Sequence, residues 1–388
     1  MEAPGIIFTC LAVSLLILLL ICGLCACLFY SSNPPKQQLP TITQKVAPLP
    51  VVTPQPFVQL EEPKRVIMPT TTSPPREFQR VARPQNLQIV EQPRFVQSAV
   101  AVETDHATEH FLREMAEPSE NRRRLIEDEF EVLSKTEARR TTRSGEKAAR
   151  HRSANRYADI VPYDHTIVPL RKENYINANF IHGENDALRW IATQAPIGVE
   201  ENKGVDTVPD FWLMVQQNNA ECIVMLTDVY EHFQQKCAEY FPKTVGQSIR
   251  YDEGVVVSLV SEAEEGRVIH REFDVFSANK SSQVSHYQYK HWKDNDAPEI
   301  SSFLDFLLLI RQRKFKSPIV VHCSAGIGRT GVFICSDNVI SRIKNEGIID
   351  IFIEVNRARQ QRPSMVHTLA QYESIYDIIA LYLRRYYR

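Results

Sequence analysis

Apolar residues follow three different patterns along this 388-residue chain. Residues 6–30 form one uninterrupted apolar run that contains no charged side chain. Residues 31–101 are rich in proline, glutamine and threonine. From about residue 102 onward, apolar positions recur at helical spacing or in short strand-like runs. The pattern therefore predicts a membrane-spanning segment, a linker and a folded region, in that order.

The run at residues 6–30 is long enough to cross a membrane as a helix, which takes roughly 20 residues. A secretory signal is the alternative, but no Lys or Arg precedes the run, and its length exceeds the roughly 7–15 residues of a signal core. We therefore favour an uncleaved transmembrane helix. Glu2 precedes the run, whereas Lys36 and Lys45 follow it. By the positive-inside rule, residues 1–5 are non-cytoplasmic and the chain is a single-pass membrane protein with its folded region in the cytoplasm.

The linker at residues 31–101 carries closely spaced prolines, for example Pro34-Pro35 and Pro74-Pro75. Such a composition cannot bury enough apolar surface to offset chain entropy, so we expect an extended, disordered tether. Partner proteins that bind proline-rich motifs are an open alternative to a plain spacer. Residues 102–120 are charged and helical, and they lead into a folded domain at residues 121–388.

The folded region mixes strand patterns with helix patterns. Residues 254–260 and 267–275 read as two strands of a hairpin. Ser301 can cap the helix that follows it, and two more helices are predicted at residues 330–343 and 368–383. This mixture predicts an α/β fold, with a twisted mixed central sheet flanked by helices in a single domain. At roughly 265 residues, the domain is large enough to bury a core.

The richest chemistry of the chain follows the apolar run Ile319–Val321. Cys323 and Arg329 stand six positions apart there and are joined by small residues. Two glycines let the backbone fold back so that several N–H groups point at one spot, and a helix beginning near Arg329 adds its positive end. A cysteine in that field is expected to be a thiolate at neutral pH, and a guanidinium pairs two phosphate oxygens at once. The alternative is a buried structural cysteine, but three glycines and an arginine fill a core poorly.

Charge and cysteine content narrow the classes of function. The 45 basic and 47 acidic side chains give a net charge of −2, so nothing draws the whole chain toward nucleic acid. Of the eight cysteines, four lie in the N-terminal apolar run and four are scattered without metal-ligand spacing. A thiolate nucleophile requires a reducing compartment, which indicates the cytosol.

The segment Val321–Gly331, VHCSAGIGRTG, resembles the signature of tyrosine-specific, cysteine-dependent protein tyrosine phosphatases. The resemblance extends from about Asn121 to the C-terminus. It implies that Cys323 is the nucleophile, that Arg329 binds the phosphate and that Thr330 donates a hydrogen bond to the sulfur. The backbone cradle for the phosphate would comprise Ser324, Ala325, Gly326, Ile327 and Gly328.

Residues 155–159, NRYAD, resemble the substrate-recognition loop of that family. By this resemblance, Tyr157 forms one wall of a deep slot and stacks on the substrate ring, and Asp159 holds the peptide backbone. A deep slot selects phosphotyrosine, because phosphoserine is too short to bring its phosphate to the floor. The resemblance also implies that Lys236 approaches the substrate side and that Glu231 steadies the signature arginine.

Residues 286–294 resemble the loop that ends in Trp-Pro-Asp in that family, with Lys293 in place of the proline. Asp294 would protonate the leaving phenolate and then accept a proton from water, a contribution typically of about 10²–10⁴-fold. Proline restricts the backbone and lysine does not. We therefore expect loop closure to be altered while the acid itself is retained.

Residues 362–372 resemble the last motif of the family, in which two glutamines stand four positions apart. His367 takes the first position and Gln371 keeps the second. The first glutamine orients the water that breaks the phosphocysteine, and imidazole differs from it in geometry and charge. We expect this change to affect hydrolysis of the intermediate more than its formation.

The resemblance as a whole implies hydrolysis of phosphotyrosine in proteins through a phosphocysteine intermediate. No metal or other cofactor is required, because the arginine and the amides balance the charge that magnesium balances in kinases. The alternative is a catalytically impaired pseudophosphatase module, tethered to a membrane, that binds phosphotyrosine without turnover. Retention of Cys323, Asp294 and Arg329 favours the enzyme. A membrane-tethered scaffold acting through its proline-rich stretch is a third interpretation.

Overall fold

The computed structural model describes residues 104–116, 120–138, 145–171, 174–183, 187–277 and 280–387. The helices are α2 (Thr104–Ala116), α3 (Glu120–Ala138), α4 (Glu146–Arg150), α5 (Val208–Gln217), α6 (Ile300–Gln312), α7 (Gly328–Glu346), α8 (Ile351–Gln361) and α9 (Leu369–Tyr386). The strands are β1 (Ala178–His182), β2 (Leu188–Thr193), β3 (Cys222–Met225), β4 (Tyr230–Glu231), β5 (Gln234–Gln235), β6 (Ser248–Arg250), β7 (Val256–Glu265), β8 (Val268–Ser277), β9 (Lys280–Tyr289) and β10 (Ile319–His322).

Two of the predicted segments fall outside these ranges. The membrane helix expected at residues 6–30 and the linker expected at residues 31–101 both belong to the part of the chain that is not described. Within the described ranges, no helix combines the length and the apolar character that crossing a bilayer requires. Both segments therefore stay predictions.

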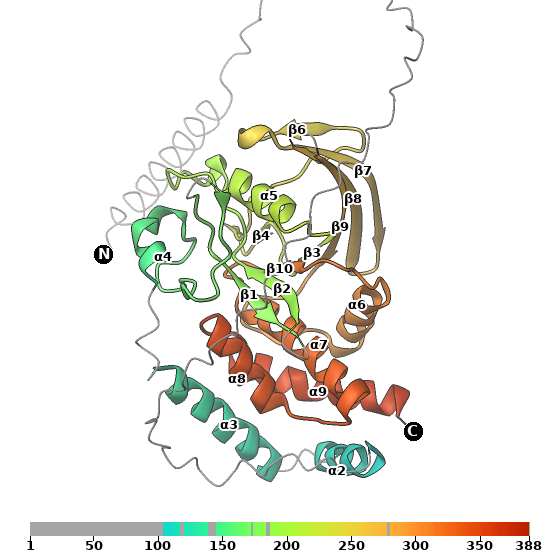
Figure 1. Ribbon diagram of the computed structural model, residues 1–388. Coiled ribbons are helices and arrows are strands. Elements are labelled where there is room, and N and C mark those ends of the chain that lie inside the picture. Colours follow the sequence, from blue (N-terminus) through green and yellow to red (C-terminus); the bar gives the residue numbers. More distant parts are fainter. Residues whose placement is uncertain are drawn as a thin grey trace, which may run out of the picture. The chain divides into compact units, whose positions relative to one another are not determined.

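Eight strands form one mixed sheet in the order β1-β2-β10-β3-β9-β8-β7-β6 (Figure 1). Strand β10 lies parallel to both of its neighbours, β2 and β3, and β3 lies parallel to β9. The long strands β7, β8 and β9 pair antiparallel. The predicted α/β fold, with a mixed central sheet and flanking helices, is confirmed.

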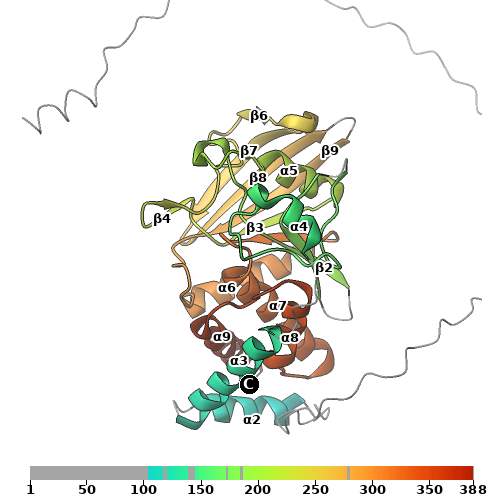
Figure 2. The ribbon, with the colours of Figure 1, turned by 90° about the vertical axis from the view of Figure 1, so that its left-hand side faces the viewer.

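The sheet separates two apolar cores, because successive side chains of a strand point to opposite faces. Val321 of β10 packs in the core that it shares with α6, α7, α8 and α9, whereas its neighbour Val320 packs in the core that contains α5. The two views of the ribbon show α6 to α9 on one side of the central strands and α5 on the other (Figure 2). Helices α2 and α3 contact α9 from outside this layer.

The predicted hairpin of residues 254–275 is present as β7 and β8. The strand β9, which extends the hairpin, was not predicted, since its first half reads KSSQVS and carries no apolar alternation. The prediction that Ser301 caps α6 was wrong. Glu299 is the N-cap, and its carboxylate accepts hydrogen bonds from the amides of Ser301 and Ser302 at 3.1 and 2.9 Å. A carboxylate there satisfies two amides that lack partners within the helix, whereas Ser301, two residues further on, lies inside the first turn and its own amide is one of the two.

The parallel strands decide where chemistry can gather. Because β10, β3 and β9 run in the same direction, the loops that follow them leave from one edge of the sheet. The loop after β10 begins with Cys323, the segment after β3 carries Glu231, and the loop after β9 carries Asp294. Residues far apart in the sequence therefore meet at this edge.

Candidate active site

The loop between β10 and α7 folds sharply around Gly326. That residue has a φ of +71°, and a Cβ atom placed on it would lie 2.1 Å from the carbonyl oxygen of Thr193. A side chain is therefore excluded both by backbone conformation and by contact with β2. Cys323, at the start of the loop, is almost completely buried, with 4% of its surface exposed.

The carbonyl groups of this loop are held on its outer side. Arg362 donates from Nε to the Gly326 oxygen at 2.8 Å and from Nη2 to the Ala325 oxygen at 3.0 Å. The oxygen of Ser324 accepts from the Ala195 amide at 2.9 Å. Because the N–H of a trans peptide points opposite to its C=O, the amides of the following residues face away from these partners. In the described part of the chain, the amides of residues 324–328 donate to no other residue.

The side chain of Arg362 is itself held by two asparagines of the segment that leads into β1 and of β1 itself. Its two terminal nitrogens donate to the side-chain oxygens of Asn179 and Asn177, each at 2.9 Å. Complete burial lowers the pKa of Arg362 to about 10, and the guanidinium stays charged at neutral pH. The motif that contains Arg362 was recognised from the sequence, but this role was not, since nothing in the motif shows that it reaches across to another loop.

Arg329 lies in the first turn of α7 with its side chain completely buried. Its Nη1 donates to Glu231 Oε1 at 2.5 Å and to the Trp292 carbonyl at 2.8 Å. Its Nη2 donates to Asp294 Oδ1 at 3.1 Å. Burial by itself would lower the pKa of Arg329, but the anionic groups around it, Cys323 foremost, raise it above its ordinary value.

A pocket of about 320 Å³ opens over Cys323. Twelve of the predicted site residues line it: Tyr157, Asp159, Lys236, Asp294, Cys323, Ser324, Ala325, Ile327, Gly328, Arg329, His367 and Gln371. Gly326 and Thr330 do not. Thr330 is completely buried, and its hydroxyl has no hydrogen-bond partner among the described residues, so its proposed bond to the sulfur stays a prediction.

The loop after β9, which carries Asp294, contributes to the wall of this pocket. Asp294 contacts Lys236 through Oδ2 at 3.2 Å in addition to Arg329. Trp292 is buried, and the carbonyl of Asn295 accepts a hydrogen bond from the Thr368 hydroxyl at 3.1 Å. The side chain of Lys293, in place of the expected proline, is exposed. The loop thus brings Asp294 to the pocket with lysine at this position, and the expected change in loop closure stays a prediction.

The recognition loop forms the opposite wall. Tyr157 and Ser324 share a hydrogen bond of 2.8 Å between their hydroxyls. Ser324 donates to the Lys236 carbonyl at 3.1 Å, so the tyrosine hydroxyl is the donor in the first bond. Next to Tyr157, Arg156 forms a buried ion pair with Glu201 at 2.6 Å, which anchors the loop.

The two residues expected to handle water differ in how they are held. Gln371 Oε1 accepts from the backbone amides of His367 at 3.0 Å and of Thr368 at 3.3 Å, which caps α9. The side chain of Gln371 also contacts Gly328, since a Cβ there would lie 2.8 Å from it. His367 is exposed at the rim.

A buried chain of hydrogen bonds ends at the backbone carbonyl of Cys323. His322 Nδ1 lies 3.1 Å from the Cys323 carbonyl, which can only accept, so Nδ1 carries the proton. The Tyr240 hydroxyl, 2.8 Å from His322 Nε2, therefore donates to it and receives a hydrogen bond from His286 Nε2 at 2.8 Å. Burial lowers the pKa of His322 to about 4 and that of His286 well below its ordinary value, so both rings are neutral at pH 7. Sequence reasoning assigned no role to these residues.

Comparison with known protein families adds the deciding observation. The family described as protein-tyrosine phosphatase matches residues 151–381, more than half of the chain.

The chain belongs to the protein-tyrosine phosphatase family.

Individual phosphatases resemble the same region. Receptor-type tyrosine-protein phosphatase F of Rattus norvegicus is 35% identical over 271 residues, covering 66% of this chain and 14% of that protein. Tyrosine-protein phosphatase non-receptor type 20 of Mus musculus is 37% identical over 235 residues, covering 59% of this chain and 53% of that protein. The solved catalytic domain of human protein tyrosine phosphatase non-receptor type 18 superposes with a TM-score of 0.63 at 27% identity, covering 71% of this chain and 99% of the domain. The chain spans at most about half the length of the receptor-type F and non-receptor type 20 phosphatases.

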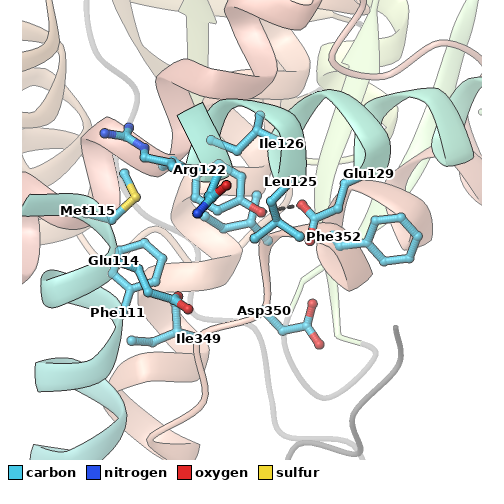
Figure 3. Close-up of a pocket in the computed structure, with 13 residues that line it drawn as sticks. Phe111, Glu114, Met115, Arg122, Leu125, Ile126, Glu129, Ile349, Asp350 and Phe352 are labelled. Carbon is cyan, nitrogen blue, oxygen red and sulfur yellow. Dashed lines mark hydrogen bonds between the residues drawn. The ribbon is translucent and has the colours of Figure 1, made fainter. Parts of the chain in front are cut away.

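A second cavity of about 320 Å³ lies away from the phosphatase pocket, among α2, α3, α9 and the start of α8 (Figure 3). Its walls include Phe111, Leu125 and Phe352. Within it, Glu129 accepts hydrogen bonds from the hydroxyls of Tyr372 and Tyr376, and burial raises the pKa of its carboxyl. None of the described residues that line this cavity is a cysteine. The pocket above Cys323 is therefore the candidate for phosphatase chemistry.

Proposed function

We propose that this chain hydrolyses phosphotyrosine in proteins through a phosphocysteine on Cys323. The observation that carries the proposal is the set of backbone amides at residues 324–328, directly after this cysteine, which have no partner among the described residues, with Arg329 beside them. Amides without another acceptor, together with a guanidinium that Glu231 and Asp294 hold in place, suit the equatorial oxygens of a phosphoryl group. A solved complex of non-receptor type 18 with HER2 phosphopeptides shows that a relative of this chain binds phosphotyrosine peptides.

In the first step, the Cys323 sulfur attacks phosphorus in line, and an S–P bond forms as the bond to the tyrosine oxygen breaks. Asp294 donates its proton to that departing oxygen, so tyrosine leaves as a neutral phenol. In the second step, water attacks phosphorus and gives a proton back to Asp294, and the S–P bond breaks. The products are inorganic phosphate and the free thiolate.

The steady-state release of phosphate from a phosphotyrosyl peptide tests the proposal. The whole chain in detergent micelles should turn over this peptide and leave the matched phosphoseryl peptide intact. Cys323→Ser should abolish turnover, whereas Cys335→Ser, which alters a buried cysteine of α7 outside the pocket, should retain it. Phosphate release by Cys323→Ser at the parent rate would refute the nucleophile.

A second candidate is a phosphotyrosine-binding module whose turnover is impaired. It is favoured by the two residues expected to position the hydrolytic water. His367 is exposed at the rim of the pocket, and the side-chain oxygen of Gln371 already accepts hydrogen bonds from the amides of His367 and Thr368. A rapid release of one equivalent of phenol per chain, followed by little turnover, would indicate a stalled phosphocysteine. His367→Gln should then restore turnover, whereas sustained turnover by the parent would exclude this candidate.

The proposed site of action is the cytoplasmic face of a membrane. The support is the uncharged apolar run at residues 6–30, which lies outside the described residues. The whole chain should stay in the membrane fraction after alkaline carbonate washing, and a chain lacking residues 6–30 should be released. Extraction of the whole chain by carbonate would contradict the anchor.

A further inference from the structure

The strands β4 and β5 form a short hairpin beside the pocket. Tyr230 pairs with Gln235, and Glu231 pairs with Gln234, so His232 and Phe233 form the two-residue turn. Both turn residues have positive φ, at 49° and 63°. Two-residue hairpin turns of this kind strongly favour Asn and Gly, because a Cβ clashes with the backbone in this conformation. A histidine followed by a phenylalanine is therefore a costly choice for this turn.

Packing does not compensate for that cost. The Phe233 side chain is completely exposed, with a relative accessibility of 107%, the highest among the exposed large hydrophobic residues in the described ranges. It makes no ring contact with another described residue. A single exposed apolar residue is ordinary on a protein surface, but one in a strained turn is not. Neither local geometry nor the core thus accounts for an aromatic residue at this position.

The position of the hairpin indicates a use for the ring. Glu231, two residues before Phe233, holds Arg329, and Lys236, three residues after it, contacts Asp294 and lines the pocket. The hairpin stands at the side of the domain, near the label β4 in Figure 2. At about 3.3 Å per extended residue, Phe233 lies within roughly 10 Å along the chain of Lys236, which lines the pocket, and within roughly 7 Å of Glu231, which holds Arg329.

An extended peptide with its phosphotyrosine in the pocket covers the same distance. Its residues two or three positions from the phosphotyrosine lie about 7–10 Å away, since the rise per residue is equal. The exposed ring offers an apolar surface and no charge, and Tyr230 at the base of the hairpin is also exposed. An apolar side chain is the complementary group, because it removes the ring from water as it binds.

We propose that Phe233 contacts an apolar substrate side chain two or three positions from the phosphotyrosine, and so determines substrate specificity. This inference rests on the proposed phosphatase function. It assigns to Phe233 a role in selecting the peptide and no role in the chemical steps.

The test is a comparison of phosphotyrosyl peptides that carry Leu or Asp at each position from −3 to +3. For the parent chain, kcat/KM should be higher with Leu than with Asp at one of the positions two or three residues from the phosphotyrosine. Phe233→Ala should reduce that ratio by roughly 3- to 10-fold, the usual range for one aromatic contact. Phe233→Leu should retain part of the ratio. Phe276→Ala, which removes another exposed aromatic ring from β8, should not change it.

Two further measurements separate loss of the ring from damage to the hairpin. Hydrolysis of p-nitrophenyl phosphate, which has no flanking residues, should be equal in the parent and in Phe233→Ala. Phe233→Gly removes the ring while relieving the strained turn, so it should lower the Leu-to-Asp ratio as Phe233→Ala does. An unchanged ratio in both variants, or a loss of activity on p-nitrophenyl phosphate that accounts for the whole effect, would overturn the inference.

Failure of the proposed function would be recognised separately. If the parent hydrolyses neither p-nitrophenyl phosphate nor any peptide, the phosphatase proposal fails. Binding of the same peptides to the Cys323→Ser chain then measures the specificity directly. In that assay, Phe233→Ala must lower the ratio of Leu to Asp affinities, and equal ratios would refute the role of the ring.

Discussion

At the scale of single residues, the site depends on which backbone groups are left without partners. Arg362 and the Ala195 amide occupy the carbonyls of the signature loop, and the amides on the other side stay available. The sharp bend that makes this arrangement fit depends on Gly326, which tolerates no side chain. The proposed binding of phosphate therefore depends on Arg362 and Ala195, which hold the carbonyls of the loop, as well as on the amides that would face the substrate.

Gly326→Ala should lose both stability and activity. The same replacement at Gly204, which has the same φ of +71° but nothing within 4 Å, isolates the cost of backbone strain, about 1–2 kcal/mol. Gly326→Ala should lower the free energy of unfolding by more than Gly204→Ala, because the new methyl also meets the Thr193 carbonyl. Urea unfolding and phosphatase assays on both variants measure the difference. Equal losses of stability would contradict the steric argument.

Asp294→Asn should slow turnover by about 10²–10⁴-fold, because the leaving oxygen then departs without a proton. The loss should be larger for phenyl phosphate than for p-nitrophenyl phosphate, whose leaving group is the weaker base. Asp296→Asn, which alters an exposed carboxylate of the same loop, is the matched control and should retain the parent rate. A loss independent of the leaving group would refute general acid catalysis by Asp294.

At the scale of secondary-structure elements, α3 contacts the segment that carries His367 and Gln371. Glu137 accepts hydrogen bonds from the amide and the hydroxyl of Ser364, in the loop that precedes His367. Glu129, two turns earlier on α3, accepts from Tyr372, the neighbour of Gln371. This helix thus supports the segment expected to position the hydrolytic water.

The partly buried Glu129 should make the attachment of α3 dependent on pH. Burial raises the pKa of Glu129 above its ordinary value of 4.5, and the nearby carboxylates of Asp350 and Glu114 raise it further, whereas the two tyrosine hydroxyls lower it. An acid with a raised pKa contributes stability below pH 4.5 and loses that contribution as the pH rises through the raised value.

Glu129→Gln should therefore gain stability relative to the parent chain between pH 4.5 and pH 7. Urea unfolding at the two pH values measures the change, and Glu127→Gln, an exposed carboxylate of the same helix, serves as the control. A constant difference between Glu129→Gln and the parent at both pH values would show that the carboxyl titrates normally.

Strand β9 and the N-cap of α6 show which features could not be predicted from the sequence pattern. Apolar alternation identified β7 and β8, because alternate residues of β8 and of the first part of β7 are buried. Strand β9 begins instead with polar residues, of which Gln283 and Ser285 donate hydrogen bonds to Asp274 and Glu272 of β8. The cap of α6 was misplaced by two residues, since both Ser301 and Glu299 are plausible N-caps until the path of the chain is known. Backbone pairing and chain path are three-dimensional properties that no local pattern contains.

At the scale of the whole molecule, the chain keeps two neutral histidines against the core that contains α5. His322 and His286 share the Tyr240 hydroxyl, and both are completely buried. A histidine with a lowered pKa contributes stability above its unfolded value, about 6.5, and this contribution is lost as the pH falls toward the folded value. For His322, whose folded pKa is about 4, the loss spans roughly pH 6.5 to 4.

The folded domain should therefore weaken on acidification across that window. His322 alone accounts for a loss on the order of 3 kcal/mol in the free energy of unfolding between pH 6.5 and 4. His322→Gln should flatten the profile, whereas His165→Gln, at an exposed histidine, should leave the slope unchanged. If His322→Gln and the parent lost stability in parallel, the buried imidazole would not be the cause.

Local sequence was enough to predict the chemistry of the candidate site. Cys323, Arg329 and the glycines between them lie in one short segment. A tight loop and the start of a helix depend mainly on neighbouring residues, so the sequence alone could indicate them. The tertiary structure decided what surrounds that segment. Arg362, Tyr240 and Glu231 come from other parts of the chain, and parallel strands bring the loops with Glu231 and Asp294 to the edge where β10 ends. A charge or a hydrogen bond acts through space, so its partners are fixed only when the chain is folded.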